Sequence, residues 1–585
     1  MATAVEQRQR VPQGGGKTSS RERAPWQPPP ARVVVARCVQ VVGAFDAVAA
    51  VLPSWHNRMA TLAHMMPTAG MLTARTATAV VGLLLVYLGA GLRRGKRRAW
   101  QLATGLCALS VVLHIVKATP APAVVAAALL GVLIVERDRF HARGDVRNRW
   151  RALWVCAGFL AAGFVLGFVE VALRSRQLIG DAGPLAWAQH VALGMIGITG
   201  PLEFEHPVTG TAVELTTGTF GLLGFVAGAV LLLRPGTRHA GFQAEDEPQV
   251  RTLLTQHGEG DSLGYFALRS DKSIIWAPSR RAAVSYRVIN GVSLASGNPL
   301  GIASAWPDAI SAWLADCREH GWTPAVLGCN TAGGTAYQRF GLDAIELGDE
   351  AIIDTAAFTL EGRSMRTVRQ AVGRARRAGY TCQVVRPRDL DDETLERARQ
   401  CAVAFRQGSV ERGFSMALSR FGDPADGDCL LVLCHDGEGR LRGLLQFVPW
   451  GGNGLSLDLM RADRGADNGI TELMIVSAVE AAPELGVKQV SLNFAVLRSV
   501  FARAEQLGAG PVIRLWARAL RAVSGLWQIE SLYRANAKYQ PCWQPRFLCF
   551  PSARDLSRVT VAALSAEAFL PSGRARRTPE RGPCA

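Results

Sequence analysis

The chain has 585 residues, of which 49% are hydrophobic and 19% are charged. Together with a mean hydropathy of +0.13, this composition excludes an ordinary soluble protein of this size and predicts a membrane domain. Lys and Arg outnumber Asp and Glu by 65 to 48, a formal net charge of +17, which favours anionic partners such as phospholipid or nucleic acid. The 12 cysteines form no C-x-x-C motif and no cluster with His at metal-ligand spacing, which argues against a zinc site and a disulfide framework.

Residues 1–32 are a basic stretch rich in Gln, Gly, Pro and Arg and are expected to form a disordered tail. Residues 33–234 are expected to form a membrane domain, because segments of about 17 to 20 apolar residues can cross a hydrocarbon core about 30 Å thick. Residues 33–52 count as a sixth span although Arg37 and Asp46 would each cost about 2.5 to 3.5 kcal/mol at the bilayer centre. The five uncharged spans are residues 76–92, 99–116, 118–135, 152–169 and 215–233, and the shorter apolar stretch 184–199 is expected to be interfacial or re-entrant.

Positive charge sets the predicted orientation of these spans. Five Lys or Arg residues crowd the loop 93–98, and six Arg residues crowd residues 137–151. Because Lys and Arg accumulate in cytoplasmic loops, both loops, the N-terminal tail and everything after Arg234 are placed in the cytoplasm. The loops around His56 and Leu202 then lie outside.

Residues 249–551 change to short β-branched or aromatic runs that alternate with helical patterns, which is typical of an α/β domain. The order strand, strand, strand, helix, strand occurs once in residues 249–385 and again in residues 386–551, which we expect to be the catalytic half. This order is typical of an N-acetyltransferase-like fold, so we expect a polytopic α-helical membrane domain followed by a cytosolic tandem domain of that type. Residues 572–585 are expected to be a second disordered tail. The elements are expected at residues 273–277, 283–288, 292–296, 308–320 (helix) and 325–329, then at 429–435, 441–448, 455–460, 469–485 (helix) and 489–494.

An acetyl-CoA enzyme is expected to carry a Q/R-x-x-G-x-G/A loop that holds pyrophosphate where a strand enters a helix. The one match, formed by Gln370, Gly373 and Ala375, falls inside a predicted helix and is interpreted as a chance match. No cofactor and no metal are therefore assigned.

The strand at residues 455–460 carries the first candidate site residues. Alternation places its three leucines on one side and Asp458 on the other, and Arg461 follows where the strand ends. A carboxylate there can orient a substrate amine, and an arginine gives bidentate phosphate contacts. The alternative is a structural ion pair between the two.

The next predicted helix begins with Asn468, Gly469 and Glu472, where backbone N–H groups and the helix dipole favour an anionic ligand. Ordinary capping, with Asn468 as the N-cap, is the alternative. Near the end of the chain Lys538 stands among aromatic residues and is a candidate phosphate contact, and a solvated lysine beside a core Trp543 is the alternative.

A further candidate is a basic helix without a single acid. A solvated helix usually interleaves both charge signs, so this one predicts a contact with tRNA or anionic lipid through Arg366 and Arg369, and a merely basic surface is the alternative. The six arginines assigned to it are Arg363, Arg366, Arg369, Arg374, Arg376 and Arg377.

Several segments, taken in order, carry a resemblance. They are YQRFG at 337–341, LGDEA at 347–351, FTLEG at 358–362 with the arginines after it, GFSM at 413–416, SLDLMR at 456–461 with Asn468 and Gly469, and the closing K-x-x-P-x-W at 538–543. This ordered set resembles the phosphatidylglycerol lysyltransferases, also called multiple peptide resistance factors, of bacterial membranes. The resemblance covers most of the cytosolic domain.

The resemblance implies an aminoacyltransferase that moves an amino acid, with lysine favoured, from aminoacyl-tRNA to phosphatidylglycerol, altering membrane charge and resistance to cationic peptides. It implies a multi-pass protein of the bacterial cell membrane whose co-substrate is aminoacyl-tRNA. It also implies that Asp458 binds the aminoacyl ammonium or assists proton transfer, and that Arg461 and Lys538 hold phosphate groups.

Two departures from the family qualify this reading. Gly297-Asn298-Pro299 stands where the family often has Gly-Asp-Pro, which puts any charge-dependent role there in doubt. Six spans leave no room for the helices linked to lipid flipping, and no lysyl-tRNA synthetase domain follows residue 551, so we expect synthesis without flipping and a donor tRNA taken from the cell's pool. An acyl-CoA-dependent or other-acceptor acyltransferase of the same fold and an inactive membrane scaffold are the alternatives, and the sequence leaves a homo-oligomer open.

Overall fold

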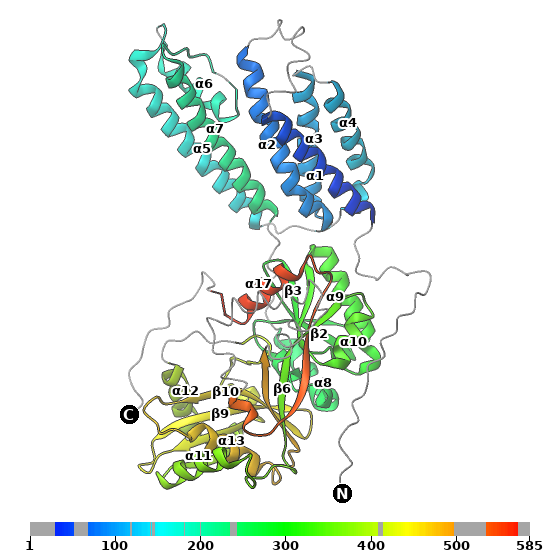
Figure 1. Ribbon diagram of the computed structural model, residues 1–585, viewed down its shortest axis with the longest axis vertical. Helices are drawn as coiled ribbons and strands as arrows, with labels where there is room; N and C mark the ends of the chain where they lie inside the picture. Colours follow the sequence, from blue (N-terminus) through cyan, green and yellow to red (C-terminus); the bar gives the residue numbers. More distant parts are fainter. Residues whose placement is uncertain are drawn as a thin grey trace.

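The structure is a computed structural model that describes residues 30–51, 68–116, 120–140, 142, 147–180, 182–198, 200–233, 243–406, 413–496 and 534–570. Most of the predicted N-terminal tail, the loop around His56 and the predicted C-terminal tail lie outside these residues. Figure 1 shows the N-terminal helices at one end of the molecule and a mixed sheet with its own helices at the other.

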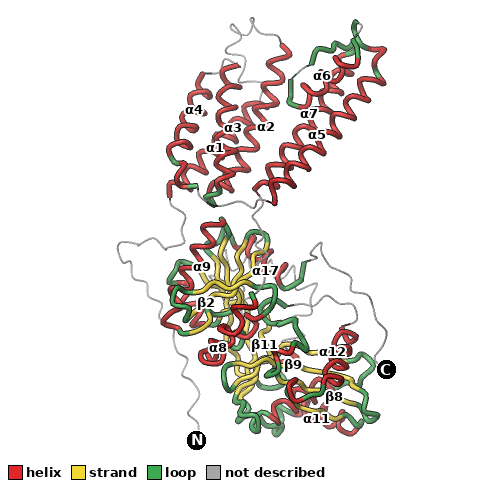
Figure 2. Tube along the Cα trace, turned by 180° about the vertical axis from the view of Figure 1, so that it is seen from behind, coloured by secondary structure: helices red, strands yellow, loops and turns green. Residues whose placement is uncertain are grey.

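The N-terminal part is helical at each predicted span. Helices α1 to α4 form one group and α5 to α7 another in both views (Figures 1 and 2). Within the described residues, three helices are long and apolar enough to cross a membrane, over Arg97–Ile115, Trp150–Leu173 and Val208–Leu232. The seven helices are α1 (Pro30–Val51), α2 (Thr68–Arg93), α3 (Arg97–Val116), α4 (Pro120–Val135), α5 (Arg147–Leu173), the short α6 (Pro184–Met195) and α7 (Pro207–Leu233).

The acid within α1 has partners on a neighbouring helix. Asp46 is 2% exposed and accepts a hydrogen bond from the Ser110 hydroxyl of α3 at 2.9 Å. His114 Nε2, one turn further along α3, lies 3.2 Å from the other carboxylate oxygen. These contacts offset the cost of burying a carboxylate among apolar helices. That cost was the reason why residues 33–52 were a weaker candidate for a span.

The C-terminal part is built on one 12-stranded sheet in the order β1-β2-β3-β5-β12-β6-β11-β10-β9-β8-β7, with β4 paired to β2. Every strand predicted in the two repeats is present, and each meander is antiparallel. The strands are β1 (Ser273–Trp276), β2 (Ala282–Ile289), β3 (Val292–Ser296), β4 (Leu300–Gly301), β5 (Thr323–Cys329), β6 (Asp343–Asp354), β7 (Thr381–Val385), β8 (Leu430–His435), β9 (Leu441–Trp450), β10 (Gly454–Ala462), β11 (Gln489–Val496) and β12 (Cys542–Phe550).

The sheet divides into two halves that do not follow the chain order. We use "first half" for β1 to β5 and "second half" for β6 to β11. The sequence boundary expected at residue 385 marks no break, because β6 and β7 precede it and still lie among the strands of the second half. The late strand β12 lies between β5 and β6, antiparallel to both, and so joins the halves.

Helices cover both faces of each half. In the first half, α8 and α17 share a core with one sheet face, and α9 and α10 share a core with the other. In the second half, α11 and α13 cover one face and α12 covers the other. The basic helix α11 begins at Arg366, so Arg363 precedes it and the prediction of a helix through Arg363 was wrong. The helices are α8 (Glu247–His257), α9 (Trp306–His320), α10 (Thr331–Gln338), α11 (Arg366–Arg377), α12 (Asp392–Arg406), α13 (Ile470–Ala481) and α17 (Leu556–Ala566).

Buried charges fill the junction of the two halves. Arg546 of β12 is 2% exposed, and its guanidinium donates to Glu350 of β6 at 2.6 Å and to Asp261 at 2.6 Å. Ser491 of β11 donates to the other Glu350 oxygen at 2.5 Å. Because removal of one partner would leave an uncompensated buried charge, this network fixes how the halves meet.

Candidate functional site

The two central strands of the second half separate part-way along their length. β10 and β11 pair in parallel only from Gly454 to Ser456 on one strand and from Gln489 to Ser491 on the other. Beyond this point the Asn493 side-chain amide donates to the Leu457 carbonyl, and the Asn493 backbone has a φ of +65°. A non-glycine residue in the left-handed region is uncommon, and asparagine is one of the few that tolerate it. The strands therefore splay, and a polar side chain bridges the opening.

Asp458 lies at this opening, on a β-bulge. The pairing of β10 with β9 passes from Leu457 opposite Phe447 to Leu459 opposite Gln446, which leaves Asp458 as the extra residue. A bulge reverses the alternation of the strand, and the prediction that all three leucines share one side was therefore wrong. Leu455 and Leu457 belong to the core beneath α11 and α13, whereas Leu459 packs against the cluster of α12.

The Asp458 carboxylate is held by two neutral donors. Its Oδ1 accepts the backbone N–H of Leu418 at 2.7 Å, and its Oδ2 accepts the side-chain amide of Gln446 at 2.8 Å. Gln446 is 2% exposed, so its orientation is fixed by packing. Both donors are neutral groups, and each of the two bonds fixes the direction of one carboxylate oxygen.

Arg461 lies three residues further on β10, opposite Leu444 of β9, and is half-buried. Its guanidinium contacts the Met460 carbonyl at 3.2 Å. Asp458 and Arg461 both lie on the part of β10 that follows its pairing with β11.

The start of α13 differs from the sequence interpretation. Gly469, with a φ of +114°, is the N-cap and makes no side-chain capping bond, so the alternative in which Asn468 caps the helix was wrong. Asn468 is exposed in the turn before it. Glycine is required at 469 because an added Cβ would lie 2.7 Å from the Ala371 carbonyl of α11.

Glu472 and Lys538 contact each other. Lys538 Nζ lies 2.6 Å from Glu472 Oε1, and the two side chains are 23% and 19% exposed. Lys538 is thus a partly buried, paired cation, and Trp543 packs at the edge of the core of the second half. This pair joins the first turn of α13 to the segment that leads into β12.

The two arginines chosen on α11 lie on its outer face. Arg366 and Arg369 are exposed, whereas Val368 and Val372 are buried against the sheet. The Arg369 guanidinium also donates to the Gly362 carbonyl at 3.2 Å in the loop before the helix. The three residues of the apparent coenzyme loop lie inside α11 and not at a strand-to-helix junction, so a pyrophosphate loop has no structural basis there.

The corresponding place in the first half is closed. β3 and β5 pair in parallel over five residues, from Val292 to Ser296 and from Thr323 to Leu327. Asn298 then donates to the Asn330 side chain at 2.9 Å and accepts the Asn330 backbone N–H at 3.1 Å. Its own backbone N–H donates to Asp261 at 2.8 Å.

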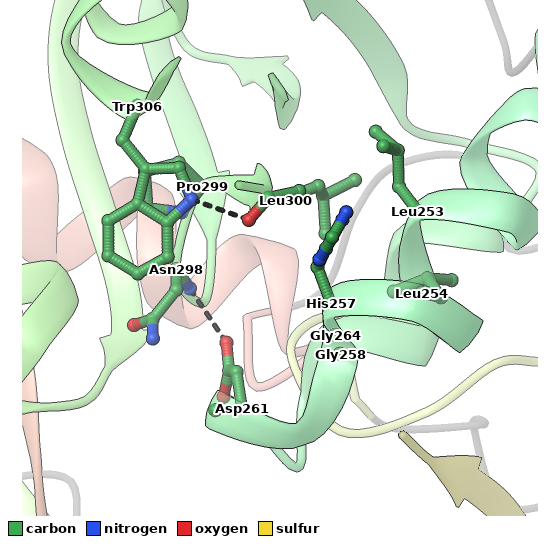
Figure 3. Close-up of a pocket in the computed structure, with 12 residues that line it drawn as sticks. Leu253, Leu254, His257, Gly258, Asp261, Gly264, Asn298, Pro299, Leu300 and Trp306 are labelled. Carbon is green, nitrogen blue, oxygen red and sulfur yellow. Dashed lines mark hydrogen bonds between the residues drawn. The ribbon is translucent and has the colours of Figure 1, made fainter. Parts of the chain in front are cut away.

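A small hollow lies beside Asn298, with a volume of about 30 Å³. Figure 3 shows Asp261 directed at Asn298, and the Trp306 ring beside Pro299 with its N–H bonded to a neighbouring carbonyl. Asn298 is 4% exposed, and its side chain makes structural hydrogen bonds to Asn330. The position at which the family often has Asp is thus occupied here by a buried, hydrogen-bonded amide.

Three residues of the site were missed in the sequence. Gln446 is the single polar residue in the apolar run Leu444 to Val448, and Asn493 shares the run Val490 to Phe494 with Ser491 only. A polar residue inside such a run must find a buried partner. That signal was available. The contact of the Leu418 N–H with Asp458 spans 40 residues of chain and has no local signal.

Comparison with known proteins gives a consistent result. Residues 251–550 match the family described as phosphatidylglycerol lysyltransferase, C-terminal, and residues 30–233 match the transmembrane region of lysyl-tRNA synthetase. The chain is 43% identical over 495 residues to the lysylphosphatidylglycerol biosynthesis bifunctional protein LysX of Rhodococcus jostii, an alignment that covers 83% of this chain and 44% of that protein. For the protein of the same name from Mycobacterium marinum the identity is 45% over 442 residues, covering 75% of this chain and 40% of that protein.

The chain thus spans less than half the length of these relatives. Among solved structures, L-PGS from Bacillus licheniformis aligns with a TM-score of 0.48 and 21% identity over 56% of this chain and 99% of that one. The family match covers just over half of the chain, including every strand of the sheet, and the chain therefore belongs to the phosphatidylglycerol lysyltransferase family.

Proposed function

We propose that this protein transfers lysine from lysyl-tRNA to a glycerol hydroxyl of phosphatidylglycerol. The observation that carries the proposal is the open end of the β10–β11 pair, where a fixed carboxylate lies in a chain of this family. The named product of the relatives, lysylphosphatidylglycerol, supports lysine as the amino acid.

The proposed reaction is an ester exchange. The lipid hydroxyl oxygen attacks the carbonyl carbon of the aminoacyl ester, the bond to the terminal ribose oxygen of the tRNA breaks, and the hydroxyl proton ends on that ribose oxygen. Because the donor is already an activated ester, the exchange needs no nucleotide hydrolysis, and the protein contributes mainly by holding both reactants in contact.

Asp458 is proposed to bind the ammonium of the aminoacyl group. The bonds from the Leu418 N–H and the Gln446 amide fix the direction of the carboxylate. A charge-assisted bond from an ammonium to a carboxylate is about twice as strong as a neutral one. Arg461 and Lys538 are proposed to hold phosphate. For Lys538 this requires the phosphate to compete with, or to lie beside, its 2.6 Å contact with Glu472.

The tRNA is proposed to contact the exposed face of α11 through Arg366 and Arg369. The acceptor lipid is supplied by the membrane domain, which contacts the sheet domain where Arg93 at the end of α2 lies 3.8 Å from Asp555. We place the sheet domain and the N-terminus in the bacterial cytoplasm because lysyl-tRNA is found there. Adding a lysyl group with two ammonium charges turns an anionic lipid into a cationic one, which weakens the binding of cationic peptides to the membrane.

The direct test is mass spectrometry of lipids from cells that express the intact chain, Asp458→Asn or the control Asp389→Asn. Asp389 is 59% exposed beside Arg388, far in sequence from the site, and its variant should behave as the intact chain. Lysylphosphatidylglycerol with the intact chain and Asp389→Asn only would support the proposal. No new lipid from the intact chain, or a product that persists in Asp458→Asn, would refute the reaction or the role of Asp458, respectively.

A second test concerns the donor. Purified protein with phosphatidylglycerol vesicles and labelled lysyl-tRNA should give labelled lipid, and ribonuclease treatment of the donor should abolish it. The double variant Arg366→Gln, Arg369→Gln should raise the KM for lysyl-tRNA roughly three- to tenfold. The slope of the logarithm of the binding constant against the logarithm of salt concentration should become shallower by about one to two units. Arg388→Gln, Arg397→Gln is the control, since both side chains are also exposed, at 58% and 60%. Equal effects of the two double variants would remove the specific role of α11.

A further inference from the structure

Helix α17 follows the last strand of the sheet and lies beyond the residues that match the family. Its buried face, which includes Leu556 and Val559, packs in the core of the first half, and Figure 1 shows it against that half on the side of the membrane helices. Glu567 is the C-cap of this helix and is 9% exposed. A buried carboxylate at the negative end of a helix dipole is unfavourable, so its partners must compensate for it.

Those partners all belong to one loop of the second half. Glu567 accepts the backbone N–H of Phe414 at 2.7 Å, the backbone N–H of Ser415 at 3.1 Å and the Ser415 hydroxyl at 2.7 Å. Three donors on one carboxylate fix the position and direction of these two residues. Both residues belong to a segment that we call "the 413–419 loop".

Two cations of the first half hold the same loop from the other side. Arg269 donates to the Ala417 carbonyl at 3.1 Å and to the Ser419 hydroxyl at 2.9 Å, and also to the Gly413 carbonyl. Lys272 Nζ lies 4.6 Å from the centre of the Phe414 ring. The loop is therefore held at both ends and in its middle by groups that belong to the other half of the sheet.

The 413–419 loop contacts Asp458, the candidate catalytic residue. The backbone N–H of Leu418, a residue with no exposed surface, donates to Asp458 Oδ1 at 2.7 Å. Gln446 of β9 donates to the other oxygen, so the loop supplies one of the bonds that set the direction of the carboxylate. A shift of the loop would turn the carboxylate and would not alter the strand that carries it.

We propose that Glu567 is a positioning residue for Asp458, which it orients through the 413–419 loop and the Leu418 N–H. This inference rests on the proposed function for its kinetic consequence, since only a reaction at Asp458 makes its orientation matter. Because Glu567 acts only through Asp458, its loss lowers kcat and leaves the KM for phosphatidylglycerol unchanged. Any rise in KM is confined to lysyl-tRNA, whose ammonium Asp458 is proposed to bind.

The test compares Glu567→Gln with Glu567→Asp, Ser415→Ala and the control Glu438→Gln in membranes containing the full chain. Glu438 is 71% exposed in a turn, and its variant should behave as the intact protein. Misplacement by about 1 Å can cost up to about 100-fold in rate, so we expect kcat to fall about 10- to 100-fold in Glu567→Gln. Ser415→Ala keeps the two backbone hydrogen bonds to Glu567, so its kcat should fall less than that of Glu567→Gln. Glu567→Asp keeps the carboxylate, so its kcat should lie between those of Glu567→Gln and the intact protein. An unchanged kcat in Glu567→Gln, or a rise in the KM for phosphatidylglycerol at constant kcat, would overturn the proposal.

Hydrogen exchange of the purified full chain separates this inference from the proposed reaction. In Glu567→Gln, peptides covering residues 414–418 should exchange faster, while peptides of the first-half core around Val559 exchange as in the intact chain. That result stands even if no lysyl lipid is formed, in which case only the proposed function fails. Exchange at 414–418 that is unchanged would refute the positioning role, and if Glu567→Gln does not fold, Ser415→Ala with the same two measurements decides.

Discussion

The two halves of the sheet share one strand order but end their central strand pair in different ways. In the first half, β3 and β5 stay paired over five residues, and Asn298 and Asn330 close the end with two hydrogen bonds. In the second half, β10 and β11 pair over three residues, and the opening holds Asp458 and Asn493. The difference teaches that two copies of one strand order can differ in where their central pairing stops, and that the opening which holds the proposed site is found in the second copy.

Polar residues of the first half contact the junction between the halves. Asp261 accepts from Arg546 and from the Asn298 backbone, and Arg546 in turn contacts Glu350 of the second half. Arg269 and Lys272 are also directed at the loop behind Asp458. The first half thus contacts the candidate site by supporting the loop and the strands of the other half.

The strongest test of this asymmetry exchanges the two side chains at the strand ends. Asp458→Asn should lower lysyl transfer by at least about 100-fold, the lower range for loss of a group that acts in the transition state. Asn298→Asp should keep most transfer, and adding it to Asp458→Asn should not restore activity. Rates with vesicles and lysyl-tRNA measure this, and restored transfer in the double variant would show that the first half also has a competent site.

The bridging asparagines provide the next comparison. Asn493→Gly keeps the left-handed backbone but removes the bond to Leu457, and we expect transfer to fall about tenfold because the reacting groups lose their alignment. Asn330→Ala removes the cap of α10, where its side chain accepts the Gly333 N–H at 3.1 Å. It should cost about 1 kcal/mol of unfolding free energy with little loss of transfer. Denaturant titration beside the rate assay separates the two, and the reverse pattern would contradict the division of roles.

The Glu472–Lys538 contact exists only in the second half and can be examined by a double-mutant cycle. Lys538→Met should lower transfer several-fold by removing the proposed phosphate contact, and Glu472→Gln should have a smaller effect. If the pair acts together, the double variant should differ from Lys538→Met alone by less than about twofold, as expected for coupled neighbours. Strictly additive losses would mean that the 2.6 Å contact has no functional coupling.

The smallest expected effect concerns a buried cation of the first half. Burial lowers the pKa of Lys272 to about 7, from 10.5 for an exposed lysine. Between about pH 7 and 10.5 the unfolded chain binds this proton and the folded chain does not, so stability rises with pH in that window, by at most about 1.4 kcal/mol per pH unit. Lys272→Met should flatten this rise. Tryptophan fluorescence during denaturant unfolding of the detergent-solubilised protein at pH 7, 8 and 9 measures it, and an equal slope in both proteins would place the titration elsewhere.

Much of this architecture follows from local patterns. The strands of both meanders, the helix α13 and the basic outer face of α11 are encoded by periodicity and turn residues over short windows, and Asp458 stands out as the one acid in an apolar strand. The bulge beneath Asp458, the N-cap at Gly469 and the pairing of Lys538 with Glu472 depend on contacts between distant segments. Such contacts leave no periodic signal in a single sequence.

The placement of β12 has a consequence for how the chain is made. Cys329 of β5 and Phe547 of β12 are neighbours in the sheet although 218 residues separate them in the chain. During synthesis β5 therefore leaves the ribosome with one edge unpaired and β6 with both edges unpaired, since β11 and β12 are made later. The halves can join only when β12 has been made. At about 5 to 20 residues per second this interval lasts on the order of ten seconds or more, long enough for open strand edges to need protection from aggregation. The nascent first half is thus the part of this protein on which a chaperone would act.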